Sequence, residues 1–289
     1  MSEGVLFEGH YKRDFFSKVR NALLRKMLYA KSARHLLANN QKVVFAFDYI
    51  TNEIAIDGIY EIDDLNILID WLAQTPDIFE GECIDAGANI GNHSLFFSKF
   101  FSRVFSFEPN PKTFKVLSIN AESVNNIDCF EFGLSSSTHF ATLNCINGNV
   151  GGSHVVRSQI SNGSKVSVPI KLTTLDSFYE NFKNIKLIKY DVEGFEYDAI
   201  LGSKKIILNF RPIVLFEQNR DEFTNGGSEV ISLLRSFGYT KFAVIKKRSA
   251  VAKVPIVGFI LRILKGSSRL IVLQNDFKPD FYPFIIAMP

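Results

Sequence analysis

The chain has 289 residues, 46% of them hydrophobic and 28 of them phenylalanine, so it can bury a sizeable core and is not a disordered protein. Its net charge of +3 hides basic ends around an acidic middle, and these ends lack zinc-finger, helix-turn-helix and RNA-binding signatures, which argues against nucleic-acid binding. Three cysteines without CxxC spacing and five dispersed histidines predict no disulfide framework and no metal site. The absence of a signal-like start or a bilayer-length apolar run predicts a cytoplasmic protein. The sequence does not indicate its oligomeric state.

Residues 1–78 have the pattern of an extension built from helices and a hairpin. Apolar residues recur at helical spacing between residues 11 and 40. Two strand-like runs at 43–50 and 54–61, joined through Thr51-Asn52, predict a hairpin, and residues 63–73 predict a helix.

From residue 79 to the C-terminus, short apolar strands alternate with amphipathic helices. The expected helices cover 91–101, 111–123, 175–183, 195–208 and 226–237, and the last expected strand is 269–275. This alternation predicts an α/β domain with a doubly wound, mostly parallel sheet. Because ligands of such sheets bind at the carboxyl ends of the strands, the last residues of each strand are the candidate site.

The segment CIDAGANIG (83–91) ends the first of these strands with a glycine turn. Gly87 and Gly91 allow a sharp turn and a close backbone approach to a ligand before a helix begins. Glu108 follows the second strand, 21 residues after Gly87, where an acid can accept hydrogen bonds from the two hydroxyls of a ribose. The pair predicts a cofactor that contains a nucleoside.

The acid Asp85 separates two candidate cofactors. The turn is GxxxG, whereas dinucleotides use GxGxxG, and Asp85 would repel a pyrophosphate placed beside it. A carboxylate at this point suits a cationic sulfonium. We therefore favour S-adenosylmethionine over NAD.

A second motif makes the interpretation specific. The segment IKYDVEGFEYDAILG (188–202) ends a strand with Asp191 and continues into a turn that contains Glu193 and Glu196. With the GANIG turn, FEPNP (107–111) and TLD (174–176) in this order and spacing, residues 82–220 resemble the FkbM family of S-adenosylmethionine-dependent methyltransferases.

The resemblance implies a Rossmann-like class I methyltransferase fold, in which a seven-stranded, mostly parallel sheet has its last strand antiparallel. It also implies O-methylation of hydroxyl groups on sugars, macrolides or similar natural products, and we expect a sugar, such as a surface polysaccharide or glycolipid. The residues that it places around the cofactor are Asp85, Gly87, Ala88, Asn89, Gly91, Asn92, His93, Glu108, Pro109, Glu131, Phe132, Gly133 and Asp191.

Methyl transfer to a hydroxyl needs positioning and is helped by a general base. Asp191 is the expected neighbour of the transferred methyl group, and Glu193 or Glu217 is the expected base, with helix capping as the structural alternative for Glu193. Two other interpretations stay open. One is a nicotinamide-dependent oxidoreductase that acts on a sugar nucleotide, and the other is a cofactor-binding partner protein that has lost its chemistry.

The segment 246–268 joins lysine and arginine to an apolar face. It predicts either a peripheral contact with an anionic membrane surface or a helix packed on the edge of the sheet.

Overall fold

The computed structural model describes residues 5–11, 16–24, 26, 50, 59–122, 124–146, 149–155, 165–224, 227–248 and 267–289. The chain divides into two compact units. The first consists of Met1–Gln74 and Ile245–Val272, and the second of Thr75–Val244 and Leu273–Pro289. The domain boundary after residue 78 that the sequence suggested stays a prediction.

In the first unit, strand β1 (Val5–Tyr11) pairs antiparallel with β14 (Ser267–Leu273), and helix α3 covers Ile62–Leu72. Residues 16–24 are helical, as their spacing predicted. Most of the predicted hairpin and residues 249–266 of the basic segment lie outside the described residues, so both stay predictions. No helix in the described part of the chain has the length and apolar character needed to cross a bilayer.

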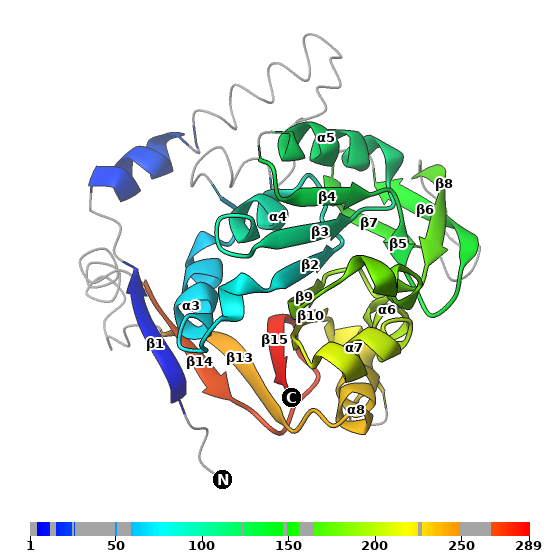
Figure 1. The fold of residues 1–289 in the computed structure, drawn as a ribbon. Coiled ribbons are helices and arrows are strands. Elements are labelled where there is room, and N and C mark those ends of the chain that lie inside the picture. Colours follow the sequence, from blue (N-terminus) through cyan, green and yellow to red (C-terminus); the bar gives the residue numbers. More distant parts are fainter. Residues whose placement is uncertain are drawn as a thin grey trace. The chain divides into compact units, whose positions relative to one another are not determined.

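The second unit is organised around a twisted sheet (Figure 1), in which seven of the described strands follow the order β4-β3-β2-β9-β10-β15-β13. Neighbours among the first five strands of this order are parallel, whereas β15 is antiparallel to both β10 and β13. This topology confirms the predicted class I methyltransferase fold. The strands are β2 (Glu82–Ala86), β3 (Arg103–Phe107), β4 (Ile127–Phe130), β9 (Ile185–Tyr190), β10 (Ile213–Gln218), β13 (Lys241–Arg248) and β15 (Tyr282–Met288).

The antiparallel strand of this sheet is not the one that the sequence suggested. The segment 269–275 was expected to be the last strand, but it forms most of β14, and β15 follows it in the chain. Strand β15 carries Pro283 near its start, and a proline argues against a central strand when only the sequence is considered. The Phe284–Ala287 stretch of β15 is nevertheless buried, and β15 pairs with β10 on one side and β13 on the other.

Three of the five helices predicted in this part of the chain differ from the observed ones only at their ends, and the other two differ in kind. The observed helices are α4 (Asn92–Phe97), α5 (Pro111–Ala121), α6 (Glu196–Leu201), α7 (Lys204–Phe210) and α8 (Glu229–Ser236), with 3₁₀ turns at Ile78–Glu80, Leu175–Asn181 and Arg220–Glu222. The long helix expected over 195–208 is interrupted near Gly202, where a Cβ atom would lie 2.0 Å from the carbonyl oxygen of Ser135. The expected helix over 175–183 is a 3₁₀ turn whose Asp176 carboxylate accepts hydrogen bonds from Lys205 and Ile206, at the start of α7.

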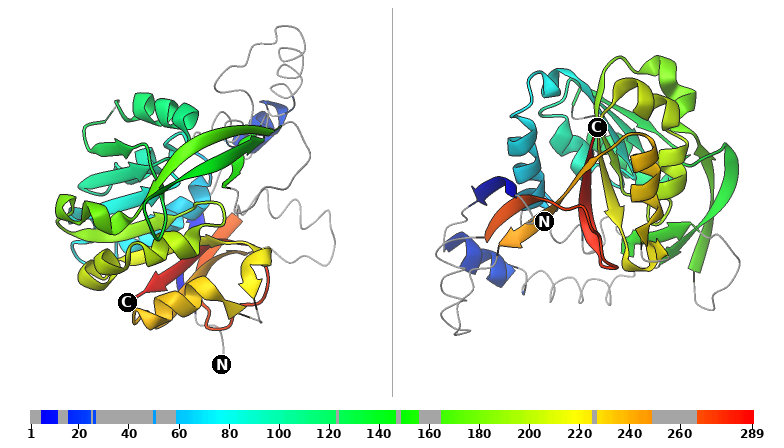
Figure 2. Two further views of the ribbon diagram at one scale, coloured as in Figure 1. Left: turned by 90° about the vertical axis from the view of Figure 1, so that its right-hand side faces the viewer. Right: turned by 90° about the horizontal axis from the view of Figure 1, so that it is seen from below.

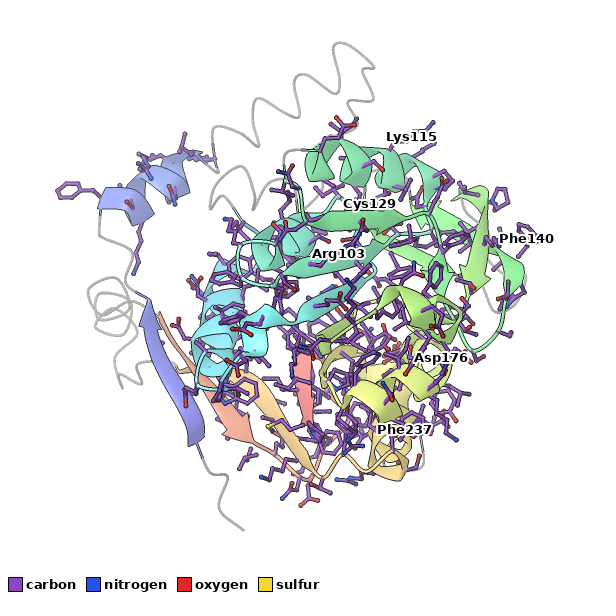
Figure 3. The ribbon with its side chains drawn as sticks, in the orientation of Figure 1. Arg103, Lys115, Cys129, Phe140, Asp176 and Phe237 are labelled. Atoms are coloured by element: carbon purple, nitrogen blue, oxygen red, sulfur yellow. The ribbon has the colours of Figure 1, made fainter. Side chains whose placement is uncertain are left out.

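A second, smaller sheet is inserted between β4 and β9. Its strands β5 (Gly133–Leu134), β6 (His139–Ile146), β7 (Asn149–Val155) and β8 (Lys165–Thr173) pair in the order β5-β8-β6-β7. Figure 2 shows β6 and β8 as long neighbouring green strands, and Figure 3 shows Phe140 pointing away from β6 into solvent, where it is 80% exposed.

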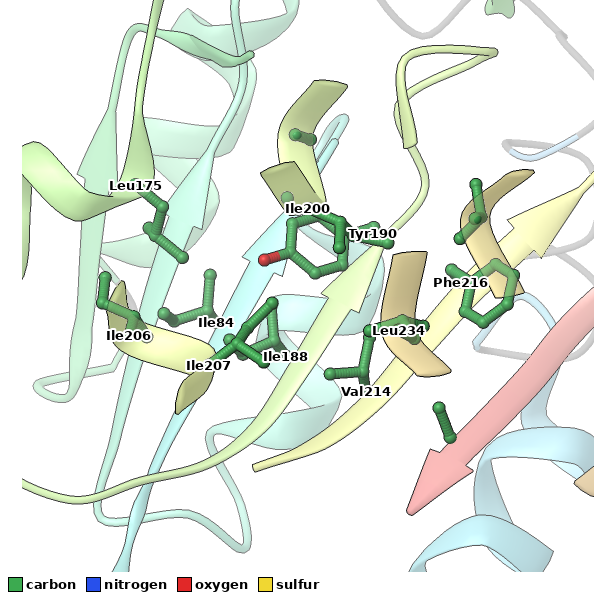
Figure 4. Close-up of a cluster of buried hydrophobic side chains, with 14 of the residues drawn as sticks. Ile84, Leu175, Ile188, Tyr190, Ile200, Ile206, Ile207, Val214, Phe216 and Leu234 are labelled. Carbon is green, nitrogen blue, oxygen red and sulfur yellow. The ribbon is translucent and has the colours of Figure 1, made fainter. Parts of the chain in front are cut away.

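The core of the second unit is an apolar layer that joins the sheet to α6, α7 and α8 (Figure 4). Strand residues at alternate positions, such as Ile84, Ile188 and Val214, face this layer together with Ile200 and Ile207 of the helices. Because side chains alternate along a strand, the residues between them face the opposite side of the sheet. This alternation places the chemistry described below on the side that α4 covers.

Replacement of a core residue tests the position of β15. Ile285→Ala removes a side chain that is fully buried between β10 and β13, so it should lower the free energy of unfolding by about 2–5 kcal/mol. Ile119→Ala on α5, where the side chain is 66% exposed, is the matched control and should change it by less than about 0.5 kcal/mol. Urea unfolding of both variants measures the difference; equal stability would contradict the burial of β15.

Candidate active site

The glycine turn after β2 is held against two neighbouring strands. The backbone N–H groups of Gly87 and Ala88 both donate to the carbonyl oxygen of Phe107, at 2.9 and 3.0 Å. Gly87 has a φ of 77°, and a Cβ atom on it would lie 1.7 Å from the carbonyl oxygen of Asp191. The turn therefore needs glycine at residue 87 both for its conformation and for its close approach to the end of β9.

Glu108, at the end of β3, fastens the turn from the other side. Its two carboxylate oxygens accept the backbone N–H groups of Asn89 and Asn110, at 3.0 and 2.8 Å. Burial raises the pKa of Glu108 to about 7, although the two backbone hydrogen bonds oppose the shift. Each oxygen has a second lone pair, so the carboxylate can still accept hydrogen bonds from a ligand.

Asp85 has different surroundings from those expected. Its carboxylate is fully buried and accepts a hydrogen bond from the Ser94 hydroxyl at 2.6 Å, and the Lys189 ammonium lies 3.2 Å away. Lys189 also lies 3.1 Å from Asp191, whose side chain is 32% exposed. The charge of Asp85 is thus balanced inside the protein, and Asp191 is the member of this bridge that solvent reaches.

The DVEG turn after β9 has an unusual backbone that Glu196 stabilises. Glu193 and Gly194 have φ values of 55° and 92°. The buried Glu196 carboxylate accepts the N–H groups of Val192 and Gly194, at 2.9 and 3.0 Å. The structure assigns this anchoring of the turn to Glu196.

Glu193 and Glu217 have raised pKa values at the carboxyl ends of β9 and β10. Burial and the negative charge of Asp191 raise the pKa of Glu193 to about 7 and that of Glu217 to about 8. Lys189 opposes the shift at Glu193, and an Asn219 amide, 3.0 Å from the carboxylate, opposes it at Glu217. The three carboxylates predicted from the strand ends therefore share one electrostatic environment, in which a base near neutral pH can exist.

The remaining predicted residues lie around this core of the site. Pro109 and Gly133 are neighbours, since a Cβ atom on Gly133 would lie 3.3 Å from Pro109. Phe132 packs on Phe178 with the Lys171 ammonium over its ring, while Glu131 is exposed. The other two predicted positions follow Gly91, where Asn92 starts α4 half-buried and His93 is buried.

Two of these positions have a structural use. A Cβ atom on Gly91, whose φ is 89°, would lie 2.9 Å from the Leu117 side chain. The ring of His93 packs beside Phe97 and Phe284, with ring centroids 6.3 and 6.1 Å away, so it contributes to packing between α4 and β15. Cofactor contact by His93 stays a prediction.

Two residues of the site were not identified from the sequence. In the sequence, Lys189 is one polar residue of a strand in which apolar and polar residues alternate. Its role becomes clear only from the pairing of the strands, which places it opposite Asp85. Glu222 accepts the Asn219 N–H at 2.9 Å and bonds Gln218, which orders the chain after β10. The sequence around residues 221–222 did not indicate a site residue, because only the fold decides how close these acids lie to the DVEG turn.

Substitution at the glycine turn tests its geometry. Gly87→Ala should destabilise the protein by roughly 1–3 kcal/mol from backbone strain alone, with a further loss from overlap with Asp191. Gly227→Ala is the matched control, because a Cβ atom there meets nothing within 4 Å, and it should stay within about 0.5 kcal/mol of the parent. Thermal and urea unfolding measure both; a Gly87→Ala protein as stable as the control would contradict the close approach.

Comparison with known proteins identifies the family of this chain. Residues 85–241 match the methyltransferase FkbM domain family, which is more than half of the chain. The hexuronic acid methyltransferase AglP of Haloferax volcanii is 32% identical over 121 residues, covering 41% of this chain and 48% of its own. Methyltransferase 1 of Beauveria bassiana is 27% identical over 177 residues, covering 54% of this chain and 66% of its own.

Among solved structures, a methyltransferase FkbM from Methylobacillus flagellatus is similar with a TM-score of 0.41 and 14% identity, over 90% of this chain and 60% of that one. This chain spans about half to two thirds of the length of the two curated relatives. The family match covers the glycine turn, Glu108, the DVEG turn and Glu217, which are the elements that meet at the carboxyl ends of the strands. The chain belongs to the methyltransferase FkbM domain family.

Proposed function

We propose that the protein is an S-adenosylmethionine-dependent O-methyltransferase that acts on a hydroxyl group of a sugar-containing acceptor. The observation that carries the proposal is the position of Glu108. One of its carboxylate oxygens accepts the Asn89 N–H of the glycine turn and the other accepts the Asn110 N–H, so each oxygen keeps a second lone pair that a ribose hydroxyl can use.

The residues present fit this cofactor. A ribose offers two neighbouring hydroxyls, and the two oxygens of Glu108 match them as acceptors. A sulfonium is a cation, and the partly exposed Asp191 carboxylate supplies negative charge at the adjacent strand end. Phe132, Pro109 and Gly133 form a mostly apolar surface at the end of β4 that suits an adenine ring.

When bound, S-adenosylmethionine supplies an electrophilic methyl group. The protein has to hold the acceptor hydroxyl in line with that group, exclude water and take up the hydroxyl proton. We assign proton uptake to Glu193 or Glu217, because their pKa values of about 7 and 8 lie near the working range of a general base. Asp191, which Lys189 holds, lines the site between them.

The acceptor class rests on a relative. AglP is described as a hexuronic acid methyltransferase, which supports a sugar as the acceptor class here; the hydroxyl, on a polysaccharide or glycolipid, is our proposal. The oxidoreductase alternative loses its support, since the chain belongs to a methyltransferase family. A binding protein without chemistry differs from the proposal only in turnover, which labelled methyl transfer to fractionated glycans and lipids measures.

Ligand binding tests the cofactor. S-adenosylhomocysteine at a hundredfold excess over its Kd should stabilise the protein by about 2.7 kcal/mol, and NAD should not. Glu108→Gln should weaken this stabilisation and Glu108→Ala should remove it, whereas Glu122→Ala, at an exposed acid directly after α5, should leave it intact. Differential scanning fluorimetry with apo baselines for each variant gives the shifts. Stabilisation by NAD but not by S-adenosylhomocysteine would sink the proposal.

The pH dependence of turnover tests the base. A base works only when deprotonated, so kcat/KM should rise about tenfold per pH unit below its pKa and level off above about pH 7–8. Replacing the base by glutamine should lower kcat by about 10²–10⁴-fold and remove this rise. Glu193→Gln and Glu217→Gln serve as controls for one another, since the increase of kcat/KM with pH should disappear in only one of the two variants. If both keep it, neither residue is the base.

A further inference from the structure

Lys189 is a buried lysine that bridges two carboxylates on different strands. Its ammonium lies 3.2 Å from Asp85 and 3.1 Å from Asp191, and its side chain is 2% exposed. Asp85 and Lys189 are direct partners in the register of β2 and β9, so their side chains share one face of the sheet. Asp191 follows two residues after Lys189, which brings its carboxylate back to the same face.

This bridge continues into the elements that carry the cofactor turn. The Ser94 hydroxyl on α4 donates to Asp85 at 2.6 Å, and the Ser106 hydroxyl on β3 donates to Ser94 at 2.8 Å. A single buried network therefore joins β2, β3, β9 and α4. Within it, Asp191 is the partly exposed carboxylate at the end that faces the strand termini.

A second constraint acts on Asp191 through its backbone. Its N–H donates to the carbonyl oxygen of Ala86 at 3.1 Å, and its carbonyl oxygen abuts Gly87. The backbone is thus fixed to the glycine turn, and Lys189 fixes the side chain. Together the two constraints hold the Asp191 carboxylate next to the glycine turn.

We propose that Lys189 is a positioning residue of the cofactor site, which holds the Asp191 carboxylate in the orientation that S-adenosylmethionine requires. The inference rests on the proposed function. If Lys189 had a purely structural role, it would act only as the countercharge of the buried Asp85 carboxylate. Its loss would then lower the stability of the protein without a specific effect on cofactor affinity.

Cofactor affinity in a double-variant cycle separates the two roles. Isothermal titration with S-adenosylhomocysteine should show that Lys189→Met and Asp191→Asn each weaken binding tenfold or more. The combined variant should bind within about twofold of the weaker single variant, because both changes remove the same oriented carboxylate. Lys186→Met, at a half-buried lysine on the same strand, is the matched control and should bind like the parent.

A variant that also removes the buried acid keeps the test valid if Lys189→Met folds poorly. Lys189→Met with Asp85→Asn leaves no unpaired charge inside, so its melting temperature should recover while its affinity stays low. Multiplicative losses in the cycle, or recovery of affinity in this variant, would overturn the inference while leaving the cofactor assignment intact. Failure of both Lys189 variants to fold, seen by circular dichroism, would overturn it as well. A parent protein that does not bind S-adenosylhomocysteine refutes the proposed function itself.

Discussion

The arrangement of this site depends on one buried charge bridge, from Asp85 through Lys189 to Asp191. Burying an ion is costly, and removing one partner of a buried pair costs about 3–5 kcal/mol, so a lysine with 2% exposure strongly constrains the strands that carry its partners. Burial by itself would lower the pKa of Lys189, yet Asp191 and Asp85 raise it overall, which keeps the ammonium charged. The bridge joins neighbouring strands β2 and β9 directly below the glycine turn.

The carboxylates around this bridge differ in their burial, their partners and their pKa values. Asp85 is paired with Lys189 inside the protein, Glu108 and Glu196 accept backbone N–H groups, and Glu193 and Glu217 have raised pKa values because they are buried and Asp191 lies beside them. Residues of the same chemical type thus have separate surroundings: a buried ion pair, hydrogen bonds to the backbone of a turn, and a site where the pKa lies near neutral pH. Such separation of carboxylate environments is how proteins place acid and base groups in one site.

Much of the fold could be predicted, because short buried strands and amphipathic helices have different periods. The failures have local physical causes. The helix expected over 195–208 is interrupted where Gly202 contacts the Ser135 backbone. Strand β15 was not predicted, because its apolar run is short and contains Pro283, and neither feature by itself indicates a strand. The small sheet between β4 and β9 was not predicted, since the pairing of its strands is decided by the tertiary fold.

By itself the sequence determined the parallel sheet, the glycine turn and the acids at the strand ends, because backbone conformation and strand periodicity are local properties. Only the tertiary structure decided what each acid does. Asp85 was expected to face a cationic cofactor, but its register opposite Lys189 buries it, and Asp191 two residues further on holds the exposed position. Burial and charge pairing depend on which strands become neighbours, and no spacing along the chain contains that information.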